Sequence, residues 1–350
     1  MEPEVIVEEW SPVGEMQAFV EKSDRTYFFY IWMNPQSEHP VIKACWICNR
    51  VKAPKGMEDA FATEGGEPCM PAEYVAHELG GIELDESSLS IQWFEEGDAA
   101  ALLSDGKLIA VIPGFSGYNN FHGYSIYAKG MGPFAWSLEQ AKERFEAVVA
   151  RSREFWAYFD EDDYWGKVQE SQMKSLEVFF GRHEKYYAID NSTFPPKALV
   201  QGRANGLLYG ITLGVSMIPM PRVEMNYEDD YRDYRRMELG FACDERYEPQ
   251  LRDVFSAISF LSSFPWLEQT FLGHGHTIPF DGIPGYKYFL FLNAAELPGV
   301  PAPAYGKFMD DRVNLLWLKP ITEKEYKLIV NKGVDAYLAG KKTADVYCLR

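Results

Sequence analysis

The feature that most constrains the fold is an apolar run followed at once by the start and stop signals of a helix, in the segment VNLLWLKPITEKEYKLIVNKG. Residues Val313 to Leu318 are mostly apolar and have the length of a strand, and Pro320 ends the run. Thr322 is a good N-cap residue with Glu325 three positions later, a capping-box pattern, and Gly333 supplies a C-terminal stop. The segment therefore predicts a buried strand that leads directly into a short helix.

The first half of the chain is predicted to be rich in strands and to end in a long helix. Aromatic and β-branched residues with partial alternation predict strands at Arg25–Met33, Val41–Cys48, Leu89–Phe94 and Lys107–Ile112. A helix is expected from Ser137 to Phe159, with Ser137 and Gln140 as its capping box. The acidic segment Asp160–Gly166 then interrupts the pattern, so we predict an N-terminal lobe of residues 1–162 and a second domain of residues 163–350.

The second half mixes strands and helices without a regular alternation. Helices are predicted at Val168–Phe180 and Leu251–Leu261, a loop at Phe194–Gly206, and strands at Leu207–Met217, Arg235–Cys243 and Tyr288–Leu292. Parallel βαβ units would need strands and helices to alternate. We therefore expect an α+β fold whose C-terminal lobe is a mixed β-sheet flanked by helices.

Composition and charge narrow the class of function. The formal net charge is −18, which argues against nucleic-acid binding, because neutralising phosphates needs clustered Lys and Arg. The same charge favours a basic protein partner. The N-terminus MEPEVIVEEW lacks the pattern of a signal peptide, and no apolar run reaches membrane-spanning length, so we expect a cytoplasmic protein without membrane contact. Five scattered cysteines predict reduced thiols.

The histidines of GHGH are the strongest candidates for catalysis. His274 and His276 are two residues apart, so on a strand both would point to one face and could share a metal. No third ligand follows at a diagnostic distance, so we predict no metal and no cofactor. Cys45 and Cys48 form an isolated CxxC, and Cys69 has no base nearby in the sequence, so packed thiols are expected.

The loop GFSGYNNFHGYS has the glycine, asparagine and aromatic content of a binding surface. Its Ser116 is followed by Gly117 and Tyr118, so the serine does not complete the G-x-S-x-G pattern of hydrolases. Packing between elements is the alternative that turn composition favours.

An acidic, tyrosine-rich segment, MNYEDDYRDYRRME, lies between two predicted strands and is the candidate partner-binding site. Its chosen residues are Tyr227, Glu228, Asp229, Asp230, Tyr231, Asp233 and Tyr234. Tyrosines offer rigid contact area, and acids select a basic partner. An exposed charged loop without function is the alternative, and the spacing of a calcium-binding loop is missing.

Four motifs in the second half follow one another in the order GITLGVSM, LGFACD, FPWLEQTFLGHGHT, and VNLLWLKPITEKE through to GVDAYL. In these motifs the chain, from about Gly166 to Gly340, resembles the suppressor of fused family, bacterial type. The resemblance implies a protein that holds a partner. Animal members sequester a transcription factor, and bacterial relatives include immunity proteins that neutralise toxins. In the animal protein this domain is N-terminal, whereas here it is C-terminal, so no partner-contact residue is carried over.

The leading hypothesis is therefore a non-enzymatic cytoplasmic protein-binding module, of the kind of a bacterial immunity protein that occludes a toxin or effector. A metal-assisted hydrolase using His274 and His276 is one alternative, and a structural subunit of an assembly is another. Binding is favoured because no complete acid-base, nucleophile or metal set stands in the sequence.

Overall fold

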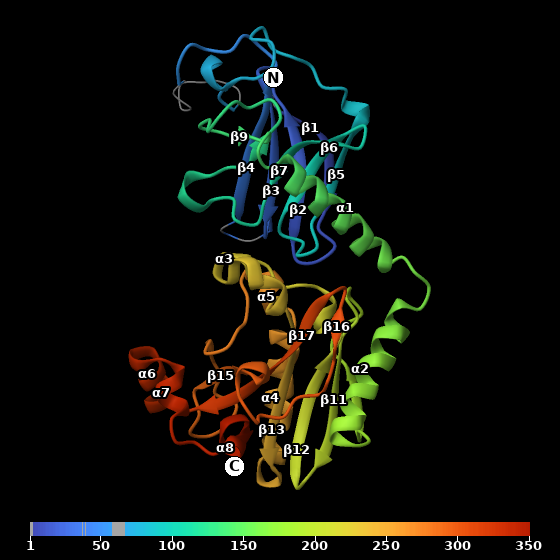
Figure 1. Cartoon of the computed structure of the whole chain (residues 1–350), viewed down its shortest axis with the longest axis vertical. Helices are drawn as coiled ribbons and strands as arrows, with labels where there is room; N and C mark the ends of the chain where they lie inside the picture. Colours follow the sequence, from blue (N-terminus) through green and yellow to red (C-terminus); the bar gives the residue numbers. More distant parts are fainter. Residues whose placement is uncertain (1–2, 37, 39, 58–66) are drawn as a thin grey trace. The chain divides into compact units, whose positions relative to one another are not determined.

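The computed structural model describes residues 3–36, 38, 40–57 and 67–350. The chain forms two compact units, Met1–Asp160 and Glu161–Arg350 (Figure 1). The domain boundary between residues 162 and 163 stays a prediction.

Two sheets, one antiparallel and one mixed, form the framework of the first unit. The first sheet runs β1 (Glu4–Trp10), β2 (Met16–Lys22), β3 (Thr26–Met33), β4 (Val41–Asn49). The second runs β5 (Leu89–Trp93), β6 (Ala100–Ser104), β7 (Lys107–Ile112), β8 (Tyr124–Ser125), β9 (Trp136–Ser137), with a parallel final pair. Successive strands are neighbours in both sheets.

The second sheet of this unit is buried on both faces. Successive side chains along a strand point to opposite faces, so alternate residues of β6 lie in two different cores. Ala100 and Leu102 of β6 belong to the core shared with β3 and β4. Ala101 and Leu103, on the opposite face, pack in a second cluster with helix α1 (Lys142–Tyr158). Near-continuous apolar sequence therefore marks a strand covered on both sides.

A mixed sheet forms the second unit, in the order β10-β11-β12-β13-β17-β15-β14. Its strands are β10 (Lys185–Ala188), β11 (Ala198–Ala204), β12 (Leu207–Leu213), β13 (Arg236–Asp244), β14 (Thr277–Pro279), β15 (Tyr288–Asn293) and β17 (Asp311–Ile321). The short strands β16 (Lys307–Phe308) and β18 (Cys348–Leu349) pair with β17 and β13. The pairs β13–β17 and β13–β18 are parallel, and the other pairs are antiparallel.

Helices cover both faces of this sheet. On one face, Leu176 and Ile329 belong to the same hydrophobic core as Trp317 of β17. The helices that contribute to this core are α2 (Tyr164–Phe180), α6 (Glu323–Lys332), α7 (Val334–Leu338) and α8 (Thr343–Tyr347). On the other, α4 (Leu251–Leu261) approaches β12 so closely that a Cβ on Gly210 would lie 2.3 Å from the Phe255 ring. Glycine is required there by close approach and not by backbone conformation. The short helices α3 (Glu224–Tyr227) and α5 (Phe264–Leu267) complete the unit.

The prediction of an α+β fold with a mixed, helix-flanked C-terminal sheet is confirmed. The strand-to-helix segment is also confirmed, because β17 leads through Thr322 into α6 and the capping box with Glu325 is made in both directions. Gly333 ends the helix at a φ of 83°. Among the residues described, no helix is both long and apolar enough to cross a membrane.

Three local predictions are wrong. The expected loop at Phe194–Gly206 contains β11, which pairs with a strand on each side even though a Pro-Pro pair precedes it. Ser137 lies in β9, so α1 begins instead at Lys142 with Ala141 as N-cap. The strand from Leu207 ends at Leu213, because Gly214 has a φ of 87°.

Candidate protein-binding surface

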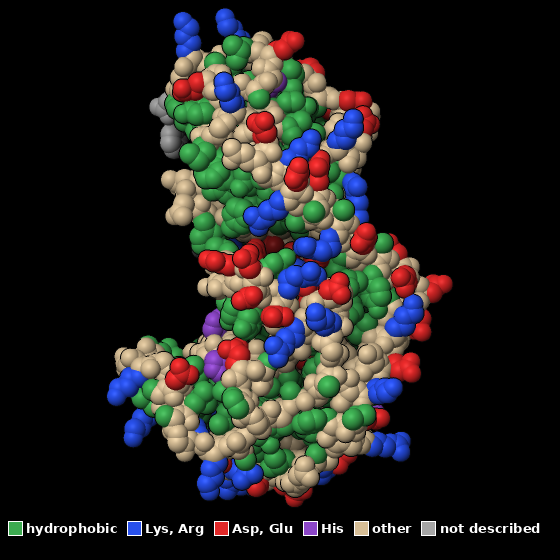
Figure 2. All heavy atoms as spheres, in the orientation of Figure 1, with side chains coloured by type: hydrophobic (Ala, Val, Ile, Leu, Met, Phe, Trp, Pro, Cys, Tyr) green, Lys and Arg blue, Asp and Glu red, His purple; other side chains and the backbone are tan. Residues whose placement is uncertain are grey.

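The acidic, tyrosine-rich segment folds as helix α3 followed by a 3-10 turn at Glu228–Asp233, and so it has more regular structure than the exposed loop considered as the alternative. The carboxylates of Glu228, Asp229, Asp230 and Asp233 are exposed, and we call this set the acidic face. Acidic side chains gather at the surface over α3 (Figure 2). Tyr227, Tyr231 and Tyr234 are half-buried between these acids and the fold.

A buried ionic cluster fixes the backbone beneath the acidic face. Asp311, fully buried at the start of β17, accepts hydrogen bonds from Arg232 Nε at 2.7 Å, Arg235 Nε at 2.7 Å and Arg236 Nε at 2.8 Å. Burial alone would raise the pKa of Asp311, but the neighbouring Arg235 and Arg236 guanidiniums outweigh it and hold that pKa below its ordinary value. The cluster therefore ties the turn to the sheet through charge-assisted bonds.

Two tyrosines of the segment stack on each other. The Tyr227 and Tyr234 rings lie 4.0 Å apart with 16° between their planes. Tyr227 also meets the edge of Phe271 at 6.0 Å, and Phe271 lies 5.0 Å from the His276 ring. The structure thus brings the acidic tyrosine segment and the GHGH segment together, although about forty residues separate them in the sequence.

The GHGH histidines lie on a turn and not on a strand, so the condition under which both side chains would point to one face is not met. His276 N donates to Gly273 O at 3.2 Å, and Gly275 has a φ of 83°. His274 Nδ1 accepts from Asn293 N at 3.2 Å, and burial lowers the pKa of His276. In the part of the chain that the structure describes, no three His, Cys, Asp or Glu side chains group as metal ligands.

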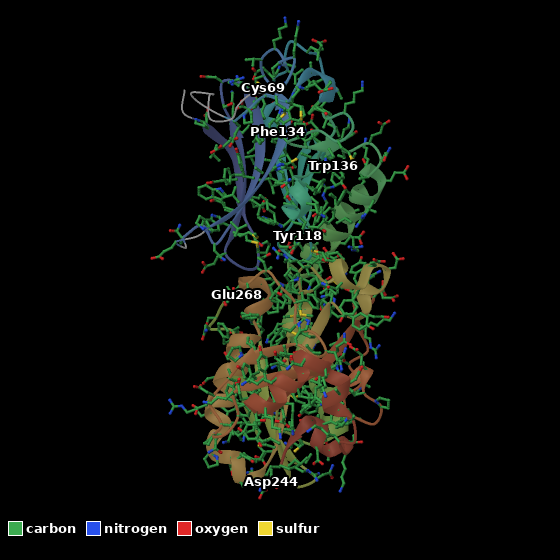
Figure 3. The ribbon with its side chains drawn as sticks, turned by 90° about the vertical axis from the view of Figure 1, so that its left-hand side faces the viewer. Cys69, Tyr118, Phe134, Trp136, Asp244 and Glu268 are labelled. Carbon is green, nitrogen blue, oxygen red and sulfur yellow. The ribbon has the colours of Figure 1, made fainter. Side chains whose placement is uncertain are left out.

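The cysteines and the serine loop of the first unit are built into its core. Cys45, Cys48 and Cys69 are buried, and burial raises the pKa of the Cys45 and Cys48 thiols, which disfavours the reactive thiolate. Figure 3 labels Cys69 on this unit. Ser116 donates to the backbone oxygen of His122 and not to its ring, whose Nδ1 lies 3.2 Å from Ala44 O. No serine–histidine pair forms at this position.

Aromatic packing accounts for most of the serine loop. Phe121 contacts Phe115 at 5.4 Å, Tyr124 at 4.9 Å and Trp136 at 4.8 Å between ring centroids. Tyr118 remains 46% exposed at the loop surface and is labelled with Trp136 in Figure 3. The loop therefore presents one exposed aromatic residue on a packed base.

Sequence reasoning missed the arginine cluster. The signal was present, because Arg235 precedes and Arg236 opens the apolar strand RMELGFACD. Arginine is rarely buried unless a carboxylate accompanies it. The sequence did not indicate which carboxylate pairs with these arginines, because Asp311 lies 75 residues from Arg236 along the chain.

Comparisons with known proteins place part of this chain. Residues 189–347 match the family model of the suppressor of fused protein (SUFU). A solved structure described as a "Putative SUFU (suppressor of fused protein) homolog" from Neisseria gonorrhoeae has 18% sequence identity and a TM-score of 0.30, and the match covers 47% of this chain and 83% of that one. No curated protein matches the chain. The resemblance read from the motifs is confirmed for residues 189–347, which are similar to the suppressor of fused family.

Proposed function

We propose that this chain is a non-enzymatic protein-binding module that captures a basic protein partner on the acidic face of its second unit. The observation that carries the proposal is that four exposed carboxylates stand on a turn held in place by a buried ionic cluster. A preordered surface loses little conformational entropy when a partner binds.

The charge that a partner would meet is negative, although arginines lie close by. Arg235 and Arg236 are 1% and 0% exposed and are engaged by Asp311, so they add little to the outer surface. Arg232 is 39% exposed in its side chain, but it too is paired with Asp311. The acidic face can therefore steer a basic partner during encounter.

The half-buried tyrosines supply the second part of the proposed interface. Tyr227 and Tyr234 are locked in a stacked pair, so their rings present area at little entropic cost. Tyr231 packs against the buried guanidinium of Arg235, whose Cζ lies 5.2 Å from the ring centroid. Rigid aromatic side chains beside charged groups are the composition of interface anchors.

The finer part of the proposal is that the partner is a toxin or effector and that the protein is a cytoplasmic immunity protein. This part rests on the suppressor of fused resemblance, in which binding and not catalysis is the shared activity. No enzymatic step is proposed, because the candidate histidines, cysteines and serine are each engaged in packing or backbone contacts.

Affinity capture tests the proposal with a charge-matched control. The bait variant Glu228→Gln/Asp229→Asn/Asp230→Asn removes three charges from the acidic face. The control Asp160→Asn/Glu161→Gln/Asp162→Asn removes three exposed charges from the acidic segment between the units. We expect a basic protein retained by the wild type and the control and lost from the acidic-face variant. Equal retention by all three baits would contradict the proposed surface.

A further inference from the structure

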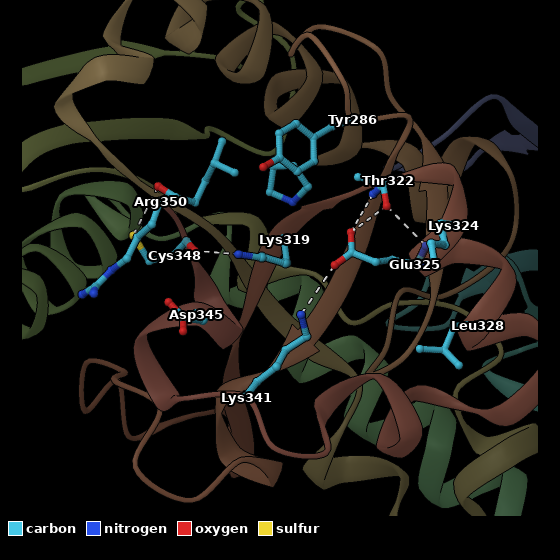
Figure 4. Close-up of a pocket in the computed structure, with 12 residues that line it drawn as sticks. Tyr286, Lys319, Thr322, Lys324, Glu325, Leu328, Lys341, Asp345, Cys348 and Arg350 are labelled. Carbon is cyan, nitrogen blue, oxygen red and sulfur yellow. Dashed lines mark hydrogen bonds and ion pairs between the residues drawn. The ribbon is translucent and has the colours of Figure 1, made fainter.

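A second, basic site lies in the second unit, at the pocket between β17, α6, α8 and β18 (Figure 4). The pocket has a volume of about 630 Å³, which is within the usual range for small-molecule sites. Its apolar lining includes Pro320, Leu328 and Leu349, together with the half-buried side chain of Tyr286. We call it the basic pocket because of the cations described next.

Lys319 places a buried ammonium at the basic pocket. The residue is 8% exposed, and its Nζ donates to the carbonyl oxygen of Cys348 at 2.6 Å. Among the residues that the structure describes, no carboxylate lies within ion-pair distance of Lys319. A buried charge normally has a paired counter-charge. Lys319 instead satisfies one N–H on a neutral carbonyl, which leaves its charge without an anionic partner.

The rest of the lining leaves a positive excess. Lys324, Lys341 and Arg350 add three cations around Lys319, against the carboxylates of Glu325 and Asp345. Glu325 is already occupied, because it accepts from Thr322 N at 2.9 Å, from Thr322 Oγ1 at 3.0 Å, and from Lys341 Nζ at 3.5 Å. In Figure 4 the side chain of Lys319 points toward Cys348, and that of Lys341 points toward Glu325. A net positive pocket stands out in a chain of net charge −18.

We propose that the basic pocket binds a small organic anion, a carboxylate or phosphate carried on an apolar body. The oxyanion would take the counter-ion place at Lys319, with Lys341 and Arg350 as further donors. The apolar body would lie against Leu328, Leu349 and the ring of Tyr286. This site is separate from the acidic face and does not depend on the proposed partner.

The protonation of Lys319 gives the proposal a distinctive pH dependence. Burial, together with the nearby charge of Lys341, lowers the pKa of Lys319 to about 8, although Cys348, Glu325 and Asp345 act in the opposite direction. Burial raises the pKa of Tyr286 to about 12 and that of the Cys348 thiol above its ordinary value, so neither becomes an anion near pH 8. An anion favours the charged lysine, so binding should take up a proton near pH 8 and weaken as the pH rises above it.

Titration calorimetry with phenyl phosphate and benzoate as probes tests the site on the full chain. The variant Lys319→Met removes the charge at similar volume, and Lys319→Arg keeps a charge that does not titrate. Lys341→Met removes a second cation from the lining of the basic pocket. Lys327→Met is the control, because Lys327 is an exposed residue of α6 that pairs with Glu323 outside the pocket. Inorganic phosphate and phenol, each alone, separate the anionic and the apolar contributions.

We expect saturable binding of both probes at pH 7, weakened about tenfold or more in Lys319→Met and unchanged in Lys327→Met. The affinity of the wild type should fall between pH 7 and pH 9.5, and Lys319→Arg should abolish that fall. If Lys319→Met fails to fold, the pH dependence and Lys341→Met still decide, because Lys341→Met removes a proposed donor and should also weaken binding. Absence of saturable binding at millimolar probe, or equal binding by all variants, would overturn the proposal. Binding of phenol as tight as that of phenyl phosphate would also overturn it.

Discussion

The acidic face and the basic pocket lie in the same unit and treat charge in opposite ways. On the acidic face the unpaired charges are exposed carboxylates, and the buried arginines beneath them share the carboxylate of Asp311. In the basic pocket the buried charge is Lys319, whose Nζ meets only a carbonyl at 2.6 Å. Beneath the acidic face the buried charges are paired and hold the backbone of the turn, whereas the buried charge of the basic pocket has no carboxylate partner, and there we propose that a ligand supplies the anion.

The largest expected effect is on the buried ionic cluster. Asp311→Asn leaves three guanidiniums around a neutral group, and we expect it to lower the free energy of unfolding by about 3 to 5 kcal/mol in urea denaturation. Asp310→Asn is the matched control, since Asp310 is exposed and Asn tolerates its positive φ of 67°. A small loss in Asp311→Asn, equal to that of the control, would show that the cluster does not hold the turn.

The same cluster predicts the direction of acid destabilisation. The folded pKa of Asp311 is depressed, so its stabilisation is fully present above the unfolded value of about 3.9 and is lost as the pH falls through the folded pKa. Wild-type stability should therefore decrease below pH 4, and part of that decrease should vanish in Asp311→Asn. Identical pH profiles of the two proteins would contradict the depressed pKa.

The next effect concerns the stacked tyrosines. Tyr234→Ala removes one ring of the pair, and we expect about 2 kcal/mol weaker binding of a captured partner, mainly as faster dissociation. Tyr234→Phe keeps the ring and is the control. Tyr231→Ala is expected to act in the same direction if Tyr231 is also an anchor. Surface plasmon resonance gives both rate constants, and unchanged dissociation across the set would exclude the tyrosines from the interface.

A smaller effect is expected from the charges of the acidic face. The variant Glu228→Gln/Asp229→Asn/Asp230→Asn should slow association about tenfold at low salt and flatten its salt dependence, because steering acts on encounter. Dissociation should change little. If stopped-flow association rates are the same with and without these charges, the interface lies elsewhere, and the loop Gly114–Tyr124 is the next surface to scan.

The smallest effect separates the basic pocket from the acidic face. Thr322→Ala removes the N-cap of α6 at the rim of the pocket, and we expect a loss of about 1 kcal/mol in thermal or urea unfolding. Thr322→Ser keeps the hydroxyl and is the control. Capture of a basic partner should be unaffected, since Thr322 is not part of the acidic face. A loss of partner capture in Thr322→Ala alone would mean that the two sites are coupled.

Predictions from sequence succeeded where a local signal was sufficient. Three such elements depend only on residues that are close together in the sequence: the capping box at Thr322, the helix Leu251–Leu261 and the strand before Pro320. The loop prediction at Phe194–Gly206 failed because it relied on a pair of prolines, which is typical of loops. The segment contains a short strand that pairs with a strand on each side. Strand pairing is a long-range interaction, so local turn chemistry can hide it.

By itself the sequence determined the α+β class, the capped strand-to-helix segment, the family resemblance and the acidic composition of residues 227–234. Only the tertiary structure decided that Asp311 joins Arg232, Arg235 and Arg236, and that Lys319 lines a pocket with Lys341 and Arg350. The physical reason is that periodicity and caps act between neighbours in the chain, whereas the burial and pairing of a charge depend on side chains that folding brings together from distant segments.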